Sequence, residues 1–194
     1  MKAVFLKGSP PAGRDPLCNR AAAAVMARAH ALSWEVKAFA LATMNIKACR
    51  GCFSCWTRTP GRCIIADDDQ EAVLRAWAGA ERIILLTPLT FGGYSPELKK
   101  ALDRAIPALL PFFIRINGET HHPQRYPRPR RLLAIGTLKG PDSESEEVFR
   151  DLVGRNALNM SDGEATTMVF SGDVPLSEME KRLGTEPFFG GTAQ

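Results

Sequence analysis

The chain has 194 residues, of which 45% are hydrophobic and 24% charged, and its formal net charge is +4 at pH 7. This length suits one domain with a full hydrophobic core, and the composition is that of an ordinary globular protein. The mild positive charge gives no case for a nucleic-acid-binding protein. We therefore expect a single domain over residues 1–194.

Neither end nor middle of the sequence carries a membrane signal. The N-terminal apolar run of residues 3–6 is too short for a signal peptide. The longest apolar run, residues 105–114, contains Pro107 and Pro111 and is too short to cross a bilayer. We expect a cytoplasmic protein with no membrane partner and no nucleic-acid partner.

Strand and helix signals alternate along the chain. Apolar runs and period-two patterns predict strands at residues 2–7, 34–41, 82–86, 132–138 and 166–170. Capping residues and period-3.6 patterns predict the helices. Five helix starts are expected, beginning with Asp15 before Pro16 and with Asp67-Asp68-Asp69 at the positive end of a helix dipole. Ser95-Pro96 starts a helix whose apolar face extends to Leu109. Ser143 and Glu146 form a capping box for the fourth helix, and Ser177 and Glu180 can cap the last one.

This alternation predicts an α/β fold, a doubly wound parallel sheet with helices on both faces. In such sheets, ligands bind at the carboxyl ends of the strands, near the point where the strand order reverses. The loops of residues 8–19, 87–94 and 136–142 therefore share one rim. A cysteine-rich segment follows the second strand, and we expect it to open on the same rim.

Two of these loops have residues that suit ligand binding. Gly8-Ser9-Pro10 connects a strand to a helix and offers backbone N–H groups and a hydroxyl to a phosphate. It lacks the lysine of an ATP loop and the glycine pattern of a dinucleotide loop, so FMN suits it better. The loop of residues 87–94 has glycines for close approach and aromatic rings for stacking on a flat ligand. The alternative for both is an ordinary strand-to-helix turn.

Four of the five cysteines lie in one segment, with the spacing C-x2-C-x2-C-x7-C. They are Cys49, Cys52, Cys55 and Cys63, and a Pro60-Gly61 turn can bring the last one back toward the others. In a cytoplasmic chain such clusters indicate metal or redox chemistry more often than structural disulfides. A [4Fe–4S] cluster, a zinc ion, a redox-active dithiol and inert free thiols are the open alternatives.

The segment of residues 111–131 has no clear period and is too long for an ordinary connection. We expect a lid or an oligomer arm here, with arginines for an anionic substrate or for NADPH and with His121 or His122 for proton transfer. The alternative is a solvated turn with surface arginines. The tail of residues 184–194 is expected to be loose or to dock onto a partner.

The strand–loop–helix opening, the Pro88–Tyr94 loop and the cysteine segment resemble the flavodoxin-like NADPH-dependent FMN reductase superfamily. The cysteine spacing resembles that of the iron–sulfur flavoproteins. The resemblance implies a five-stranded sheet of order 2-1-3-4-5, FMN on the rim, and a homodimer or homotetramer. The expected FMN-binding residues are Ser9, Pro10, Cys18, Asn19, Pro88, Leu89, Thr90, Phe91, Gly92, Gly136 and Thr137, and the expected cluster ligands are Cys49, Cys52, Cys55 and Cys63.

Three functions follow from these features. The leading hypothesis is an FMN-binding oxidoreductase that moves electrons between a small-molecule or protein donor and an acceptor, with a [4Fe–4S] cluster on the four cysteines. The second is an NAD(P)H-dependent flavin, quinone or nitro reductase without a cluster. The third is a zinc-stapled binding protein that is not an enzyme. No catalytic acid or base can be assigned from the sequence.

Overall fold

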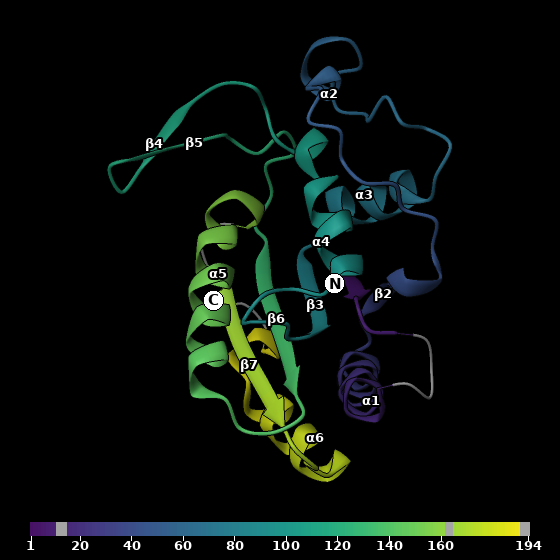
Figure 1. The fold of residues 1–194 in the computed structure, drawn as a ribbon, viewed down its shortest axis with the longest axis vertical. Coiled ribbons are helices and arrows are strands. Elements are labelled where there is room, and N and C mark those ends of the chain that lie inside the picture. The colour runs from purple at the N-terminus through teal and green to yellow at the C-terminus, as the bar shows by residue number, and fades with distance from the viewer. Residues whose placement is uncertain (11–14, 162–164, 191–194) are drawn as a thin grey trace.

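The computed structural model describes residues 1–10, 15–161 and 165–190. Within them, five parallel strands form one sheet in the order β2-β1-β3-β6-β7 (Figure 1). The strands are β1 (Lys2–Lys7), β2 (Glu35–Ala40), β3 (Arg82–Pro88), β6 (Arg131–Leu138) and β7 (Ala165–Ser171). Because β6 and β7 are the fourth and fifth strands expected from the sequence, the predicted flavodoxin-like order 2-1-3-4-5 is confirmed.

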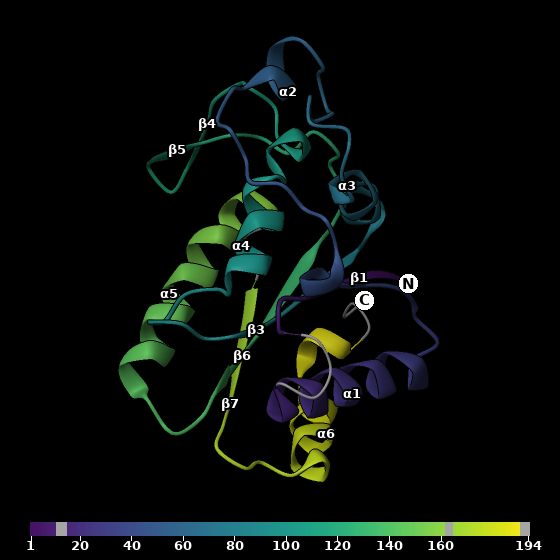
Figure 2. The same cartoon turned by 45° about the vertical axis from the view of Figure 1, so that its right-hand side comes forward.

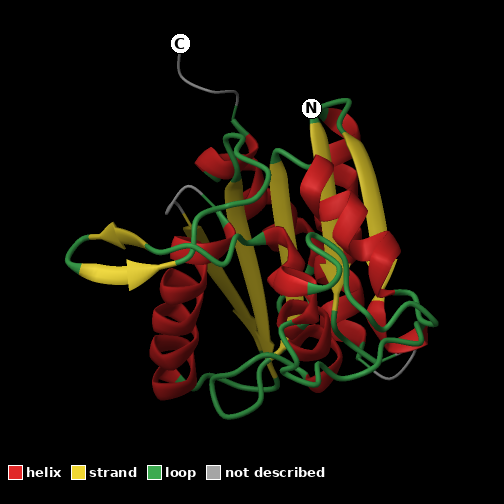
Figure 3. Cartoon of the chain, turned by 90° about the horizontal axis from the view of Figure 1, so that it is seen from above, coloured by secondary structure: helices red, strands yellow, loops and turns green. Residues whose placement is uncertain are grey.

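Helices cover both faces of this sheet (Figure 3). The helices α3 (Gln70–Gly79), α4 (Pro96–Asp103) and α5 (Ser143–Met160) pack on one face, and α1 (Pro16–Ala31) and α6 (Leu176–Thr185) pack on the other. Neighbouring residues of a central strand serve opposite faces: Ile83 joins the first core cluster and Ile84 the second. The middle residues of the central strands, such as Ile83–Leu86, are apolar, as expected for strands with both faces buried.

Several helix boundaries differ from the expected ones. The helix after the three aspartates begins only at Gln70, and α4 ends at Asp103, because Pro107 cannot continue a helix and the chain changes to a 3₁₀ turn at Ile106–Ala108. Helix α5 is capped by Asp142, whose carboxylate accepts a hydrogen bond from the Ser145 N–H at 3.0 Å, and not by the predicted Ser143. Helix α6 begins at Leu176 without a side-chain cap, so the predicted Ser177 capping box is wrong.

The segment of residues 111–131 contains a β-hairpin that the sequence pattern did not reveal. Its strands, β4 (Ile114–Ile116) and β5 (Glu119–His121), pair antiparallel and project from the body of the molecule (Figure 1). Asn117 and Gly118 form the turn with φ angles of 49° and 85°. Asn-Gly is the preferred pair for such a turn, so this dipeptide was the signal for the hairpin.

The C-terminal segment packs on its own chain as far as the structure describes it. Residues Pro187–Phe189 form a 3₁₀ turn in which Phe188 and Phe189 are buried, and the Phe189 ring stacks on Trp34 at 5.4 Å. The expectation of a loose or partner-bound tail is therefore wrong for residues 184–190, and residues 191–194 lie outside the described part. In the described residues, no helix has the length and hydropathy needed to cross a membrane.

Candidate functional site

The loop after β1 is held against the start of α4. Ser95 caps α4 by accepting a hydrogen bond from the Leu98 N–H, and its hydroxyl donates to the Gly8 carbonyl at 2.5 Å. The Gly8 N–H in turn donates to the Leu86 carbonyl at 2.8 Å. A Cβ atom on Gly8 would lie 2.6 Å from the Leu98 Cβ, so only glycine fits at this close approach of loop and helix.

The loops after β3 and β6 meet beside the first loop. The Leu89 N–H donates to the Thr137 carbonyl at 2.9 Å, and the Leu89 side chain lies so close to Gly136 that a Cβ there would be 2.9 Å from it. The Thr137 hydroxyl donates to the Cys18 sulfur at 3.5 Å. The fold therefore brings together predicted FMN-binding residues from all three loops.

Cys18 supports this rim from below. Its side chain is fully buried, and burial raises the pKa of its thiol to about 11. The thiol is therefore protonated at neutral pH and is a packing and hydrogen-bonding group beneath Thr137. Its backbone N–H donates to the Asp15 carboxylate at 2.9 Å, which confirms Asp15 as the cap of α1.

A lysine that the sequence reasoning overlooked lies at the same rim. Lys7 ends β1, and its ammonium group donates to the Asn19 amide oxygen at 2.5 Å. The pair gives the rim a positive charge and an amide next to Ser9, which suits a phosphate. The signal was the position of Lys7, directly before the Gly8-Ser9 loop. Residues 11–14, the rest of that loop, lie outside the described residues.

The tip of the second loop lies at the start of α5. Thr90 and Gly93 exchange two backbone hydrogen bonds of 3.1 and 2.9 Å, which makes a tight turn. Gly92 has a φ of 74°, and a Cβ there would lie 2.6 Å from Val148 of α5. Phe91, which lies in this turn between Thr90 and Gly93, is 98% exposed. It is therefore free to contact a ligand or a partner protein.

The four cysteines of residues 49–63 all line one cavity of about 590 Å³. Cys49 and Cys52 are exposed, whereas Cys55 and Cys63 are half-buried, and all four are free thiols. Hydrogen bonds from Ser54 hold the pKa of Cys52 below its ordinary value. Burial raises the pKa of Cys55, and repulsion from the neighbouring cysteine thiolates adds to it. Among the described residues, no three metal-binding side chains are grouped closely enough to hold a single ion.

This cavity is separate from the described residues of the three loops that are predicted to bind flavin, called the flavin loops below. Its other walls come from the second half of α4, the C-terminal half of α5, Trp77 and the hairpin segment, and none of the predicted FMN-binding residues lines it. The loop of residues 88–94 leads into the N-terminal end of α4. Figures 1 and 2 show the short helix α2 (Ser54–Thr57) beyond the opposite, C-terminal end of α4. Within one chain, the expectation that the cysteines open on the flavin rim is therefore wrong. After β2 the chain passes along α4 and reaches the C-terminal end of that helix before the first cysteine, Cys49.

The segment of residues 111–131 covers the cysteine side and not the flavin loops. Trp56 of α2 donates to the Leu109 carbonyl at 3.1 Å and packs on the His122 ring at 4.6 Å. His121 points elsewhere, to Asn159 and Glu119, so the two histidines do not form a pair. The guanidinium of Arg125 donates to the Pro107 and Leu109 carbonyls. This arginine, predicted to meet an anion, thus has a structural role.

Comparisons with known proteins agree with this architecture. The sequence model of the NADPH-dependent FMN reductase family matches residues 1–120. An iron–sulfur flavoprotein from Methanocaldococcus jannaschii is 35% identical over 116 residues, which are 59% of this chain and 57% of that protein. The chain thus matches little more than half the length of this curated relative.

Solved structures resemble the chain in fold. An NAD(P)H:quinone oxidoreductase from Methanothermobacter marburgensis has a TM-score of 0.69 at 12% identity and covers 93% of this chain and 96% of its own. An FMN-dependent NADH-azoreductase from Bacillus anthracis, in complex with FMN, has a TM-score of 0.62 at 12% identity, with 94% and 93% covered. With the family match over more than half of its length, the chain belongs to the NADPH-dependent FMN reductase family.

Proposed function

We propose that the protein is an FMN-binding oxidoreductase in which the four-cysteine segment holds a [4Fe–4S] cluster. The observation that carries the proposal is that all four cysteines line one cavity in a chain of a flavin reductase family. Four cysteine thiolates are the usual ligands of such a cluster. The proposal includes a cytoplasmic location and a small-molecule or protein donor and acceptor, with NAD(P)H as a possible co-substrate.

The residues at the rim suit FMN. Bound FMN supplies exchange between two-electron and one-electron chemistry. Ser9, Asn19 and Lys7 offer a hydroxyl, an amide and a positive charge to its phosphate. Pro88, Leu89 and Thr90, with Gly136 and Thr137 beside them, would form the wall for its ring. These residues would bind and orient the cofactor, and none of them would need to act as an acid or base.

The residues at the cavity suit a cluster better than a zinc ion. Zinc sites made of four cysteines usually pair two separated C-x2-C units, and here the C-x2-C units overlap. Overlapping pairs that bring several thiolates to one cavity suit an iron–sulfur cluster. Cys49, Cys52, Cys55 and Cys63 would hold it, and the rings of Phe53 and Trp56, which neighbour Cys52 and Cys55 in sequence, lie 5.3 Å from each other.

Anaerobic purification with iron, sulfide and flavin analysis tests the cluster. We expect about four irons and four sulfides per chain, with a flavin spectrum beneath that of the cluster. Cys63→Ser should lose the cluster, and Cys18→Ala is the matched control because Cys18 is buried elsewhere. Full iron and colour in Cys63→Ser, or four free thiols in the anaerobic wild type, would show that the four-ligand proposal is wrong.

A second candidate is an NAD(P)H-dependent reductase without a cluster. It is favoured by the absence, among the described residues, of any three ligands grouped around one point. Stopped-flow mixing of the FMN-loaded protein with NADPH or NADH separates the two functions. Rapid bleaching of the flavin in a protein without iron supports this candidate, and no bleaching with either nicotinamide supports an electron carrier.

We propose in addition that the protein is a homo-oligomer. Phe91, Phe112 and Phe113 are 98%, 66% and 72% exposed, which is costly for large apolar rings in water. The separation of the two sites within one chain also favours an assembly in which copies bring them closer. Light scattering should give a mass of two or four chains, and a monomer at micromolar concentration would contradict the proposal.

A further inference from the structure

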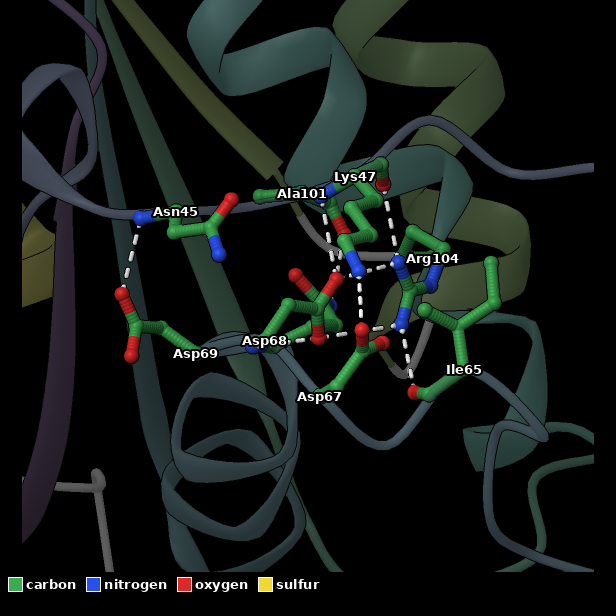
Figure 4. Close-up of polar contacts among 9 residues, drawn as sticks. Asn45, Lys47, Ile65, Asp67, Asp68, Asp69, Ala101 and Arg104 are labelled. Carbon is green, nitrogen blue, oxygen red and sulfur yellow. Dashed lines mark hydrogen bonds and ion pairs between the residues drawn. The ribbon is translucent and has the colours of Figure 1, made fainter.

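A buried ion pair lies at the end of α4, next to the cysteine segment. Arg104 follows the last residue of α4, and its side chain and that of Asp68 are each 1% exposed. The two groups form a fork: Nη1 of Arg104 lies 2.7 Å from Oδ2 of Asp68, and Nη2 lies 3.2 Å from Oδ1 (Figure 4). Such bidentate geometry is specific to arginine and fixes the direction of both side chains.

The same pair holds both ends of the cysteine segment. Arg104 donates to the Lys47 carbonyl at 2.8 Å and to the Ile65 carbonyl at 3.1 Å (Figure 4). Lys47 stands two residues before Cys49, and Ile65 stands two residues after Cys63. Asp68 also accepts from the Lys47 N–H at 3.0 Å. The chain just before the first cysteine and the chain just after the last one are therefore joined to each other and to the end of α4.

The other two aspartates strengthen this junction. Asp69 accepts from the Asn45 N–H at 2.8 Å and returns a backbone hydrogen bond to the Asn45 carbonyl at 2.9 Å (Figure 4). Asp67 pairs with the Lys47 ammonium group. The three aspartates, which the sequence predicts as a helix start, thus bind the segment that precedes the cysteines.

The burial of this arginine is costly. Its Nε is buried without a nitrogen or oxygen partner. A buried ion pair is costly to desolvate and adds little stability over an apolar core, so its presence here calls for a reason other than stability.

We propose that Arg104 is the positioning residue of the cysteine segment. Together with Asp68 it holds residues 47 and 65 against α4, so that the four thiols face one cavity. The inference deepens the proposed function, and it rests on that function only for the identity of the group that the thiols bind. The positioning itself is a property of the metal-free chain.

Alkylation of the metal-free full-length protein tests the positioning. Iodoacetamide is added at one pH, and each cysteine is followed by mass spectrometry. In the wild type, exposed Cys49 and Cys52 should react first, half-buried Cys55 and Cys63 more slowly, and buried Cys18 not at all. Arg104→Met keeps an unbranched apolar side chain and removes the charge and the donors. It should accelerate Cys55 and Cys63 by roughly tenfold or more, because the segment opens locally.

Two further variants separate positioning from general damage. Arg104→Lys should give an intermediate rate, because an ammonium group cannot reach Asp68 and both carbonyls together. Arg75→Met is the matched control: it breaks an exposed ion pair with Glu71 on α3 and should leave all five rates unchanged. Wild-type rates for Cys55 and Cys63 in Arg104→Met would overturn the proposal.

Buried Cys18 reports whether the domain as a whole stays folded. If Cys18 becomes reactive in Arg104→Met, the whole domain has opened, and the double variant Arg104→Met with Asp68→Leu replaces it, since it leaves no unpaired charge. The double variant should show the same acceleration with Cys18 protected. Slow Cys55 and Cys63 in this folded variant would overturn the proposal.

Iron and sulfide reconstitution then distinguishes the two levels of inference. If the wild type takes up no cluster, the proposed function is wrong, while the alkylation rates still decide the role of Arg104. If the wild type takes up a cluster, Arg104→Met should retain less of it or shift its midpoint potential. Equal cluster content and equal potential in the two proteins would contradict the role of Arg104 and leave the proposed function intact.

Discussion

The two ends of α4 hold two sites by different physical means. At the N-terminal end, Ser95 joins the flavin loops through neutral hydrogen bonds, and Gly8 fits by its lack of a side chain. At the C-terminal end, Arg104 joins the cysteine segment through a buried charge pair. One end depends on shape and hydroxyl groups and the other on charge, so the two sites can be weakened separately.

The difference follows from the lengths of the connections. The flavin loops are short links between a strand and a helix, and backbone hydrogen bonds from the sheet reach into them. The connection from β2 to α3 covers residues 41–69, with only a 3₁₀ turn and the four-residue α2 as regular structure. A long connection with few backbone hydrogen bonds needs side-chain contacts to keep one conformation. The ion pair of Arg104 supplies them.

The largest effect on stability is expected from Asp68→Ala, which removes one partner of the ion pair at the C-terminal end of α4. The substitution leaves Arg104 buried without its partner, and we expect a loss of about 3–5 kcal/mol in the free energy of unfolding. Urea unfolding at pH 7 measures it. Glu71→Ala, which removes a carboxylate paired at the surface with Arg62 and Arg75, should change the midpoint little. Similar midpoints for the two variants would mean that the buried pair does not hold the segment.

A smaller effect is expected from Gly8→Ala at the neutral end. The new methyl group would meet Ser95 and Leu98 at 2.6 Å, and overpacking of this kind costs about 1–3 kcal/mol. FMN affinity, followed by flavin fluorescence, should fall, because the first loop is displaced. The alkylation rates of the four cysteines should stay at wild-type values. If those rates rise as well, the two ends of α4 are not independent.

The smallest effect is expected from mild acid. Burial alone would raise the pKa of Asp68, but Arg104 and the N–H groups of Lys47 and Gln70 hold it below its ordinary value. A carboxyl group with a lowered pKa stabilises the fold above about pH 4, and this contribution is lost as the pH falls through the lowered pKa. The hydrogen bond from Lys47 also lowers the pKa of Asp67, so this carboxyl group likewise loses its stabilising contribution as the pH falls.

The measurement is the difference in unfolding free energy between wild type and Asp68→Ala at several pH values. It should be constant from pH 7 to about 5 and narrow below about pH 4. The difference between wild type and Gly8→Ala should not follow this trend, since no titrating group is involved. A wild-type advantage over Asp68→Ala that persists at pH 2.5 would argue against an ionic junction.

Local chemistry was sufficient to predict most of the sheet and its rim. Apolar runs such as Arg82–Leu86 predicted the central strands, and Asp15 and Ser95 predicted two helix starts, because capping is decided within a few residues. The hairpin was missed although Asn117-Gly118 marked its turn, since its strands have three residues each and bury little. Lys7 was missed although it stands directly before the Gly8-Ser9 loop, because its contact with Asn19 forms only in the folded chain.

The sequence alone determined the α/β fold class, the three loops at the strand ends and the identity of the four thiols, because these depend on periodicity, capping and spacing. The strand order came from the resemblance to a known family. The tertiary structure decided where the thiols lie. Their position at the far end of α4 depends on Arg104 and Asp68, which are 36 residues apart and meet only in the folded chain. No local pattern encodes such a contact: Asp68 has the appearance of a helix start in the sequence, and only folding makes it the partner of a buried arginine.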